Sequence, residues 1–252
     1  MANGGHGGSR HDLRRAEPLR KNPSPLEGAA TREDDMTFTT YQVQPVLDLI
    51  GRYESRGDYD IVYGGIPKAQ RPAKLTAMTI AQVIDWQRRV VNAGAASSAA
   101  GKYQIIRKTL EASVAATGMS QGRKFDKAAQ DELAMHLLRG RGMRRFLDGL
   151  MDADDMALGL AKEWASLPVP RDMKGQSRQV KAGQSYYAGD GLNKAHATVA
   201  EVEQALLVAR ERYRSRATAP VTAPNATKPA APSSGIIAAL LALFKSMFGG
   251  KS

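Results

Sequence analysis

Between about Thr39 and Arg216, apolar residues recur at helical spacing in one segment after another, and this pattern constrains the fold most. The predicted helices span about 45–55, 79–91, 106–117, 126–139, 143–150, 152–165 and 198–216. Thr79 and Thr198 stand at N-cap positions, and Glu201 completes a capping box with Thr198. Residues 59–63 are β-prone, Gly64-Gly65 would turn the chain, and residues 74–78 could pair back. We therefore expect an α+β fold that is mostly helical with a small β-hairpin.

The segments on either side of this body differ from it in composition. Residues 1–38 hold glycine repeats and mixed charges without an apolar period, so we expect a disordered leader. Residues 39–216 form the predicted folded domain, and the Ala, Pro and Thr of residues 217–234 are typical of a semi-rigid linker. Residues 235–252 predict an amphipathic helix whose apolar run is about half the roughly twenty residues of a bilayer span. Such a helix would lie on a membrane or a partner, and docking back on the body is the alternative.

Composition excludes several kinds of site. The chain has 252 residues and no cysteine, which excludes disulfide scaffolds, thiolate metal sites and thiol nucleophiles. The four histidines lack metal-ligand spacing, so we expect neither a metal nor a cofactor. A net charge of +11 favours a polyanion, which could be nucleic acid, an anionic membrane or an anionic cell wall. We expect no nucleic-acid partner, because basic clusters interleaved with aromatics and recognition motifs are missing.

Glu54 is the candidate catalytic residue. It lies in the last turn of the first predicted helix, where the helix dipole disfavours a carboxylate. Beside Tyr53 and near a cleft, such a glutamate would have a raised pKa and could act as a general acid. The alternative is a solvated glutamate paired with Arg52 or Arg56, and periodicity alone favours that alternative.

Three further segments follow Glu54 at a specific spacing, namely residues 59–65 (Tyr-Asp-Ile-Val-Tyr-Gly-Gly), 97–104 (Ser-Ser-Ala-Ala-Gly-Lys-Tyr-Gln) and 164–168 (Trp-Ala-Ser-Leu-Pro). The series resembles the lambda-type phage endolysins, which are lysozyme-like peptidoglycan lytic transglycosylases, over about residues 46–207. The resemblance implies that Glu54 is the sole catalytic carboxylate and that residues 101–104 line a sugar-binding cleft. It also implies cleavage of the β-1,4 bond between N-acetylmuramic acid and N-acetylglucosamine. Glu54 would protonate the leaving oxygen and then, as a base, close a 1,6-anhydro ring.

Hydrolysis of the same bond by water is the alternative chemistry. A two-carboxylate glycosidase would need a second acid, for which Asp58 and Asp60 are the nearby candidates. We interpret Asp58 as a turn residue and Asp60 as a hairpin residue. The Glu, Asp and Thr spacing of another type of phage lysozyme is absent, because Tyr63 and Ala69 occupy those positions. An inactive wall-binding or virion structural protein is the alternative from a different functional class.

Sugar binding needs aromatic ring faces and amides, which singles out Tyr103 and Gln104 as substrate contacts. Residues 185–193 form a polar, aromatic and glycine-rich loop similar to a tyrosine-containing motif of more distant lytic transglycosylases. That similarity implies Tyr187 as a further contact, with an ordinary tight turn as the alternative. Trp164 shares an apolar stripe with Leu160, so we expect it in the core.

The resemblance also indicates where the protein acts and on what. The expected partner is the glycan strand of peptidoglycan, with anionic membrane or lipopolysaccharide as a further target of the helix 235–252. The leader contains no apolar signal segment. We therefore expect synthesis in the host cytoplasm and action on the wall in the periplasm, after holin release or delivery with the virion.

Overall fold

The computed structural model describes residues 38–218, and residues 38–214 belong to one compact unit. The predicted amphipathic helix 235–252 lies outside the described residues, as do the predicted leader apart from Phe38 and the predicted linker apart from its first two residues. Those first two residues continue the last helix, which ends at Thr218. No helix within residues 38–218 is both long and apolar enough to span a bilayer.

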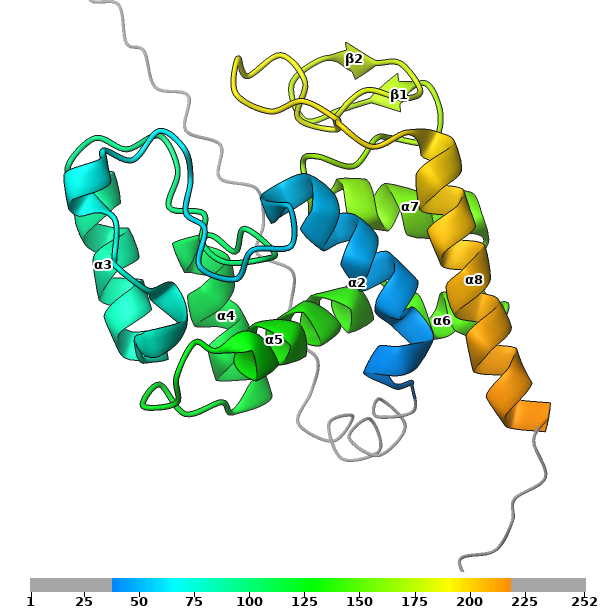
Figure 1. Cartoon of the computed structure of the whole chain (residues 1–252). Coiled ribbons are helices and arrows are strands. Elements are labelled where there is room, and N and C mark those ends of the chain that lie inside the picture. Colours follow the sequence, from blue (N-terminus) through cyan, green and yellow to red (C-terminus); the bar gives the residue numbers. More distant parts are fainter. Residues whose placement is uncertain (1–37, 219–252) are drawn as a thin grey trace, which may run out of the picture. The chain divides into compact units, whose positions relative to one another are not determined.

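Helices dominate the described chain (Figure 1). They are α2 (Thr40–Ser55), α3 (Ile80–Asn92), α4 (Arg107–Thr117), α5 (Lys127–Gly140), α6 (Met143–Leu147), α7 (Ala153–Ala161) and α8 (Val199–Thr218), with the single-turn 3₁₀ helices η1 (Lys68–Gln70) and η2 (Leu75–Ala77) between α2 and α3. A small antiparallel sheet pairs β1 (Met173–Lys174) with β2 (Gln179–Val180), and Met173 lies opposite Val180. The predicted fold class, a mostly helical, lysozyme-like α+β fold, is confirmed.

The capping residues of α3 and α8 act as their sequences predict. The Thr79 side chain accepts a hydrogen bond from the Gln82 backbone, and the Gln82 side chain accepts one from the Thr79 backbone. In α8, the Thr198 hydroxyl accepts a bond from the Glu201 amide at 3.2 Å, and the Glu201 carboxylate accepts one from the Thr198 amide at 2.9 Å. Each box satisfies backbone N–H groups that a helix start leaves without partners.

Helix α2 begins at Thr40, five residues before the predicted start at Pro45, so the prediction that the helix opens at this proline is wrong. Thr39 caps the helix and forms a capping box with Gln42. Pro45 therefore lies inside α2, where its missing N–H leaves the Tyr41 carbonyl without its usual partner. Arg212 of α8 donates to that carbonyl instead, at 3.1 Å. A long-range hydrogen bond thus compensates for the proline.

The predicted hairpin over residues 59–78 is absent. Val62 forms an isolated antiparallel bridge with Ala100, and residues 75–77 form η2 rather than a strand. The Asp60 carboxylate accepts bonds from the Thr76 amide at 2.7 Å and from its hydroxyl at 3.2 Å, which joins the two segments without a strand ladder. Tertiary contacts thus override the local β preference of residues 59–63. The two-stranded sheet lies elsewhere in the chain, between β1 and β2.

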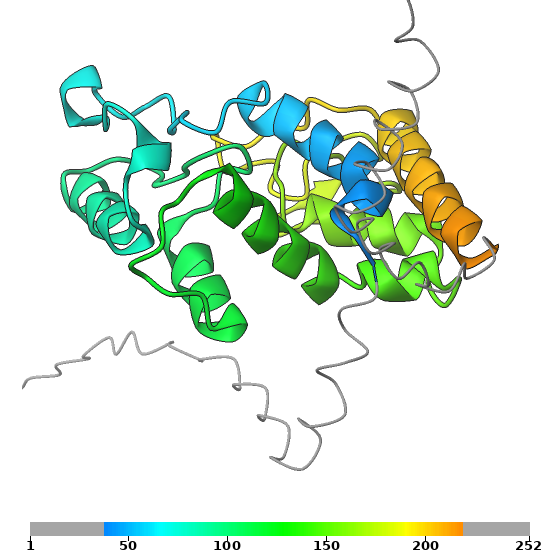
Figure 2. The ribbon, with the colours of Figure 1, turned by 60° about the horizontal axis from the view of Figure 1, so that its bottom comes forward.

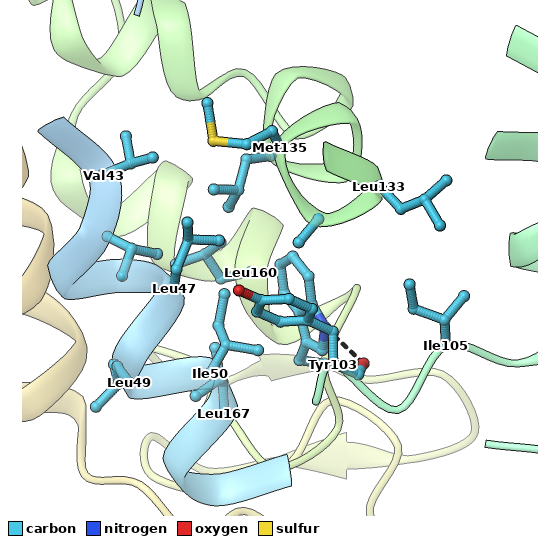
Figure 3. Packing of buried hydrophobic residues seen from close by; sticks show 14 of the residues in the cluster. Val43, Leu47, Leu49, Ile50, Tyr103, Ile105, Leu133, Met135, Leu160 and Leu167 are labelled. Carbon is cyan, nitrogen blue, oxygen red and sulfur yellow. Dashed lines mark hydrogen bonds between the residues drawn. The ribbon is translucent and has the colours of Figure 1, made fainter. Parts of the chain in front are cut away.

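Tyr103 lies in the core between α2, α5 and α7. In Figure 3 its ring lies among side chains from these helices, which include Leu47, Ile50 and Leu160. Trp164 is 3% exposed, as expected for a core residue, and its indole N–H donates to the Tyr103 carbonyl at 3.2 Å. In Figures 1 and 2, α2 lies between α3 and α4 on one side and α8 on the other. The core therefore anchors α2 and the Tyr103 turn together.

Candidate active site

Glu54 occupies the last turn of α2, which ends where Arg56 adopts a left-handed conformation with φ 58°. One carboxylate oxygen, Oε1, accepts a hydrogen bond from the Ser166 hydroxyl at 2.6 Å and from the Ser166 amide at 3.3 Å. Burial raises the pKa of the Glu54 carboxyl above its ordinary value, whereas the two bonds from Ser166 and the charge of His196 act in the opposite direction. The group is thus a desolvated carboxyl with one oxygen engaged by the protein.

The arginines that could have paired with Glu54 serve other purposes. Arg52 Nη1 lies 3.8 Å from Glu201 Oε1, and the Glu201 carboxylate also accepts the Tyr53 hydroxyl at 2.6 Å. Arg56 is the C-cap of α2. The solvated ion pair expected from periodicity alone is therefore not what this helix end forms.

Ser166 is fixed from both sides and is 5% exposed. Helix α7 ends at Ala161, short of the predicted Ala165, and the next residues turn so that the Trp164 indole enters the core. The Ser166 carbonyl accepts bonds from the amides of His196 at 2.7 Å and Ala197 at 3.2 Å. Ser166 was not predicted from the sequence as a partner of Glu54. The position of Ser166 within the segment 164–168 was the one feature of the sequence that pointed to it.

A cleft of about 550 Å³ opens beside Glu54. That volume lies in the range of roughly 300–1,000 Å³ that is typical of small-molecule sites. Its walls come mainly from residues 96–99 and 103–109, from residues 162–165 and from the loop that contains Tyr187, Leu192 and Asn193. All four predicted site residues border it, namely Glu54, Tyr103, Gln104 and Tyr187. The fold thus gathers predicted residues from three distant segments around one hollow.

The turn of residues 101–104 is tightly specified. Gly101 has φ 76°, and a Cβ atom there would lie 2.2 Å from Gln130 Oε1. The same Gln130 oxygen accepts a bond from the Lys102 amide at 2.8 Å. Gln104 has φ 47°, and its side-chain amide donates to the Gly101 carbonyl at 2.9 Å. Only glycine fits at position 101, and the resulting turn places Gln104 at the cleft.

Tyr103 borders the cleft from its inner side. The residue is 1% exposed, and its hydroxyl donates to Asp131 Oδ1 at 2.7 Å. Burial and the nearby Asp131 carboxylate raise the pKa of this phenol. The ring that the sequence offers as a sugar platform is therefore largely enclosed in the core, where it supports the Gln104 turn.

Tyr187 ties its loop to the segment after α7. Its hydroxyl donates to the Lys162 carbonyl at 2.6 Å, and its ring lies edge-on to Tyr186 at 5.3 Å between centroids. Burial raises the pKa of the Tyr187 phenol. The residue is half-buried and borders the cleft, so part of its surface faces the hollow.

The other nearby carboxylates have structural partners. Asp58 Oδ1 accepts the Asp60 amide at 2.8 Å, which is the predicted turn role, and Asp60 holds Thr76. Neither residue is among those that line the cleft. Glu163 lines it, but its carboxylate pairs with Arg141 at 2.6 Å. Within residues 38–218, no group of three or more histidines and carboxylates is placed to hold a metal ion.

A protein-family model described as Endolysin matches residues 51–192, which is more than half of the chain. The match covers the end of α2, the cleft walls and most of the loop that contains Tyr187. A search of curated proteins and a search of solved structures each gave no significant match.

Proposed function

The chain belongs to the endolysin family of phage enzymes that degrade the bacterial cell wall, and we propose that it is a lytic transglycosylase. Its substrate is the β-1,4 bond between N-acetylmuramic acid and N-acetylglucosamine in peptidoglycan. The observation that carries the proposal is the Glu54 carboxyl, which lies at a cleft of sugar-binding size with a pKa raised by burial, whereas the other carboxylate of the cleft, Glu163, pairs with Arg141. A carboxyl of this kind holds its proton closer to neutral pH and can deliver it.

The two oxygens of Glu54 have different roles in the proposed reaction. Both hydrogen bonds from Ser166 reach Oε1, so Oε2 is the atom that carries the proton to the leaving glycosidic oxygen. The 2-acetamido carbonyl of the muramic acid stabilises the cation that forms. The Glu54 carboxylate then removes the proton from the C6 hydroxyl, which attacks C1 and closes the 1,6-anhydro ring. Glu54 ends the cycle protonated, and no water is consumed.

Gln104 and Tyr187 are the proposed substrate contacts, with Tyr103 as the support beneath them. The side chain of Gln104 offers an amide to hydroxyl and acetamido groups, and Tyr187 offers a partly exposed ring. The enclosure of Tyr103 supports a role in holding the 101–104 turn. The occupied carboxylates of Asp58, Asp60 and Glu163 favour a mechanism with one acid over a two-carboxylate hydrolysis.

Digestion of purified Gram-negative peptidoglycan, with the products identified by mass spectrometry, tests this proposal. We expect fragments lighter by one water than those of a hydrolase, and we expect Glu54→Gln to slow their release by about 10²–10⁴-fold. Glu132→Gln is the matched control, because Glu132 is exposed on α5 and pairs with Arg123 at 2.6 Å. Products with an ordinary reducing end would show that water attacks C1, so that the reaction is hydrolysis and not ring closure. A lack of products from the unaltered chain would favour an inactive wall-binding or virion structural protein.

The proposed place of action is the periplasmic face of the wall, reached by holin release or with the virion. Residues 235–252 lie outside the described residues, but their sequence supports contact with an anionic membrane or lipopolysaccharide. A peptide of residues 217–252 should cause leakage of anionic vesicles. Failure to bind them would leave a partner protein, or the body itself, as the target of this segment.

A further inference from the structure

A second cavity, of about 460 Å³, adjoins the catalytic cleft at the loop that follows Tyr187. Its walls come from residues 183–185, 188–189, 191 and 193–195 together with Arg178. Asn193 borders both hollows, and Leu192 beside it faces the cleft. The two hollows therefore lie on either side of Asn193, so they are close enough to take two parts of one molecule.

The second cavity presents positive charge. Arg178 and Lys194 are its charged lining residues, and none of its lining residues is acidic. Arg178 donates from Nε to the Ala188 carbonyl at 3.0 Å, and within the described chain its terminal nitrogens Nη1 and Nη2 donate to no protein acceptor. Lys194 is exposed and has no partner within residues 38–218. Both cations are thus available to an anionic ligand.

The charged groups near the second cavity do not neutralise the positive charge of Arg178 and Lys194. Lys181 and Asp172 neutralise one another at 2.7 Å. The Asp190 carboxylate accepts bonds from the amides of Leu192 and Asn193 at 2.9 and 2.8 Å, and these bonds hold its pKa below the ordinary value. Asp190 therefore fixes the rim of the cavity instead of occupying the two cations.

Glycines shape the wall next to Arg178. Gly189 has φ 109°, and a Cβ atom there would lie 2.9 Å from Arg178 Cδ. The absence of a side chain at this position lets Arg178 lie across the loop. Gly183 and Gly191 also have positive φ, and a Cβ atom on either would meet nothing within 4 Å. At these glycines no side chain covers the backbone, so a ligand with peptide groups of its own can approach the backbone N–H and C=O groups closely.

We propose that this second cavity binds the peptide stem of the wall polymer, with Arg178 and Lys194 pairing with its carboxylates. The inference rests on the proposed function. A muramic acid in the cleft carries a short acidic peptide on its lactyl group, and that peptide must leave the sugar ring toward some part of the surface. The cavity beyond Asn193 adjoins the cleft, matches the charge and leaves peptide-sized space.

The test compares two substrates for the full chain. One is intact peptidoglycan, and the other is glycan strands from which an amidase has removed the stems. We expect Lys194→Ala to lower kcat/KM on intact peptidoglycan about two- to fivefold, and the double variant Arg178→Ala/Lys194→Ala about three- to tenfold, the range for partly exposed ion pairs. Activity on stripped strands should not change. Lys194 makes no structural hydrogen bond in the described chain, so its replacement does not threaten the fold.

The control variant is Lys68→Ala/Lys74→Ala, which removes the same net charge from exposed positions near η1 and η2. It should behave as the unaltered chain on both substrates. Equal losses on both substrates, or the same loss in the control, would overturn the proposal. Calorimetry with a free stem peptide gives a second readout, and we expect binding that the double variant loses. If the unaltered chain cleaves neither substrate, the proposed function fails, whereas absent stem binding overturns this inference by itself.

Discussion

Ser166 donates both its hydroxyl and its backbone amide to the same oxygen of Glu54, at 2.6 and 3.3 Å. The two residues lie 112 positions apart, one at the end of α2 and the other in the segment after α7. These donors stabilise the carboxylate, whereas burial stabilises the protonated acid. Ser166 therefore sets the balance between the two forms that the proposed reaction uses in turn.

Ser166→Ala should shift the pH dependence of activity. Loss of the hydroxyl removes the larger of the two hydrogen-bond effects that lower the pKa of Glu54, so this pKa rises further. The reaction needs the protonated acid first, so activity falls as pH rises through that pKa. We expect the alkaline limb of kcat/KM to move to higher pH, measured on a soluble glycan substrate. Ser120→Ala, at an exposed position, is the control. An alkaline limb that stays in place or moves to lower pH would contradict this role.

Glu54→Gln should lower activity, because the general acid is lost, and should raise stability above the pKa of Glu54, because a buried charge is removed. Loss of the general acid should reduce kcat by about 10²–10⁴-fold. A carboxyl whose folded-state pKa is raised stabilises the fold fully below the unfolded value and loses that contribution as pH rises through the folded pKa. The variant and the unaltered chain should therefore unfold at similar temperatures at about pH 4, and the variant at higher temperature at about pH 8. Thermal unfolding checks this, and equal curves at both pH values would argue against a desolvated Glu54.

Gly101→Ala should destabilise the fold far more than Gly118→Ala. Both glycines have positive φ, which costs about 1–2 kcal/mol for alanine. At Gly118, a Cβ atom would meet nothing within 4 Å, so strain is its whole cost. At Gly101, it would also collide with Gln130, whose side chain holds the turn. Denaturant unfolding should give a free-energy loss at position 101 that exceeds the loss at 118 by about 1–3 kcal/mol. Equal losses would mean that Gln130 moves aside without cost.

Arg212 and Pro45 should be energetically coupled. Arg212→Ala removes the donor to the Tyr41 carbonyl and the cation that lies 4.9 Å from the Tyr41 ring, and we expect a loss of about 1–2 kcal/mol. In a Pro45→Ala background, the alanine N–H supplies the usual helix hydrogen bond to Tyr41. The loss should therefore be smaller there, and a double-mutant cycle measures the difference. An additive cycle would show that Arg212 acts through other contacts.

Gln104→Ala and Tyr103→Phe should separate substrate binding from support. Gln104 borders the cleft, so its truncation should raise KM about three- to tenfold, and loss of its bond to the Gly101 carbonyl should cost about 1 kcal/mol of stability. The Tyr103 hydroxyl is bonded to Asp131, so its removal should cost about 1 kcal/mol of stability and leave KM unchanged. Steady-state kinetics and thermal unfolding of both variants check this division. A raised KM for Tyr103→Phe at unchanged stability would restore Tyr103 as a direct contact.

Several features followed from the sequence because short-range interactions determine them. The capping boxes at Thr79 and Thr198 place each cap within three residues of its partner, so α3 and α8 begin where the pattern predicts. The apolar period that defines these helices is equally local. Glu54 at the end of a helix, and its order relative to the later segments, were also visible in the chain itself.

Other features were decided by contacts between residues far apart in the chain. Asp60 bonds Thr76 where a hairpin was expected, and Arg212 donates to the carbonyl that Pro45 leaves without a partner inside α2. Asp131 draws the Tyr103 hydroxyl inward, and Ser166 meets Glu54 only because the segment after α7 turns back toward α2. Hydrogen bonds of this kind leave no periodic trace in a sequence, since each depends on the packing of two elements that local preferences do not place. The sequence by itself determined most of the helices and singled out Glu54 as the candidate acid, and the tertiary structure determined the partners of Glu54 and the walls of the cleft beside it.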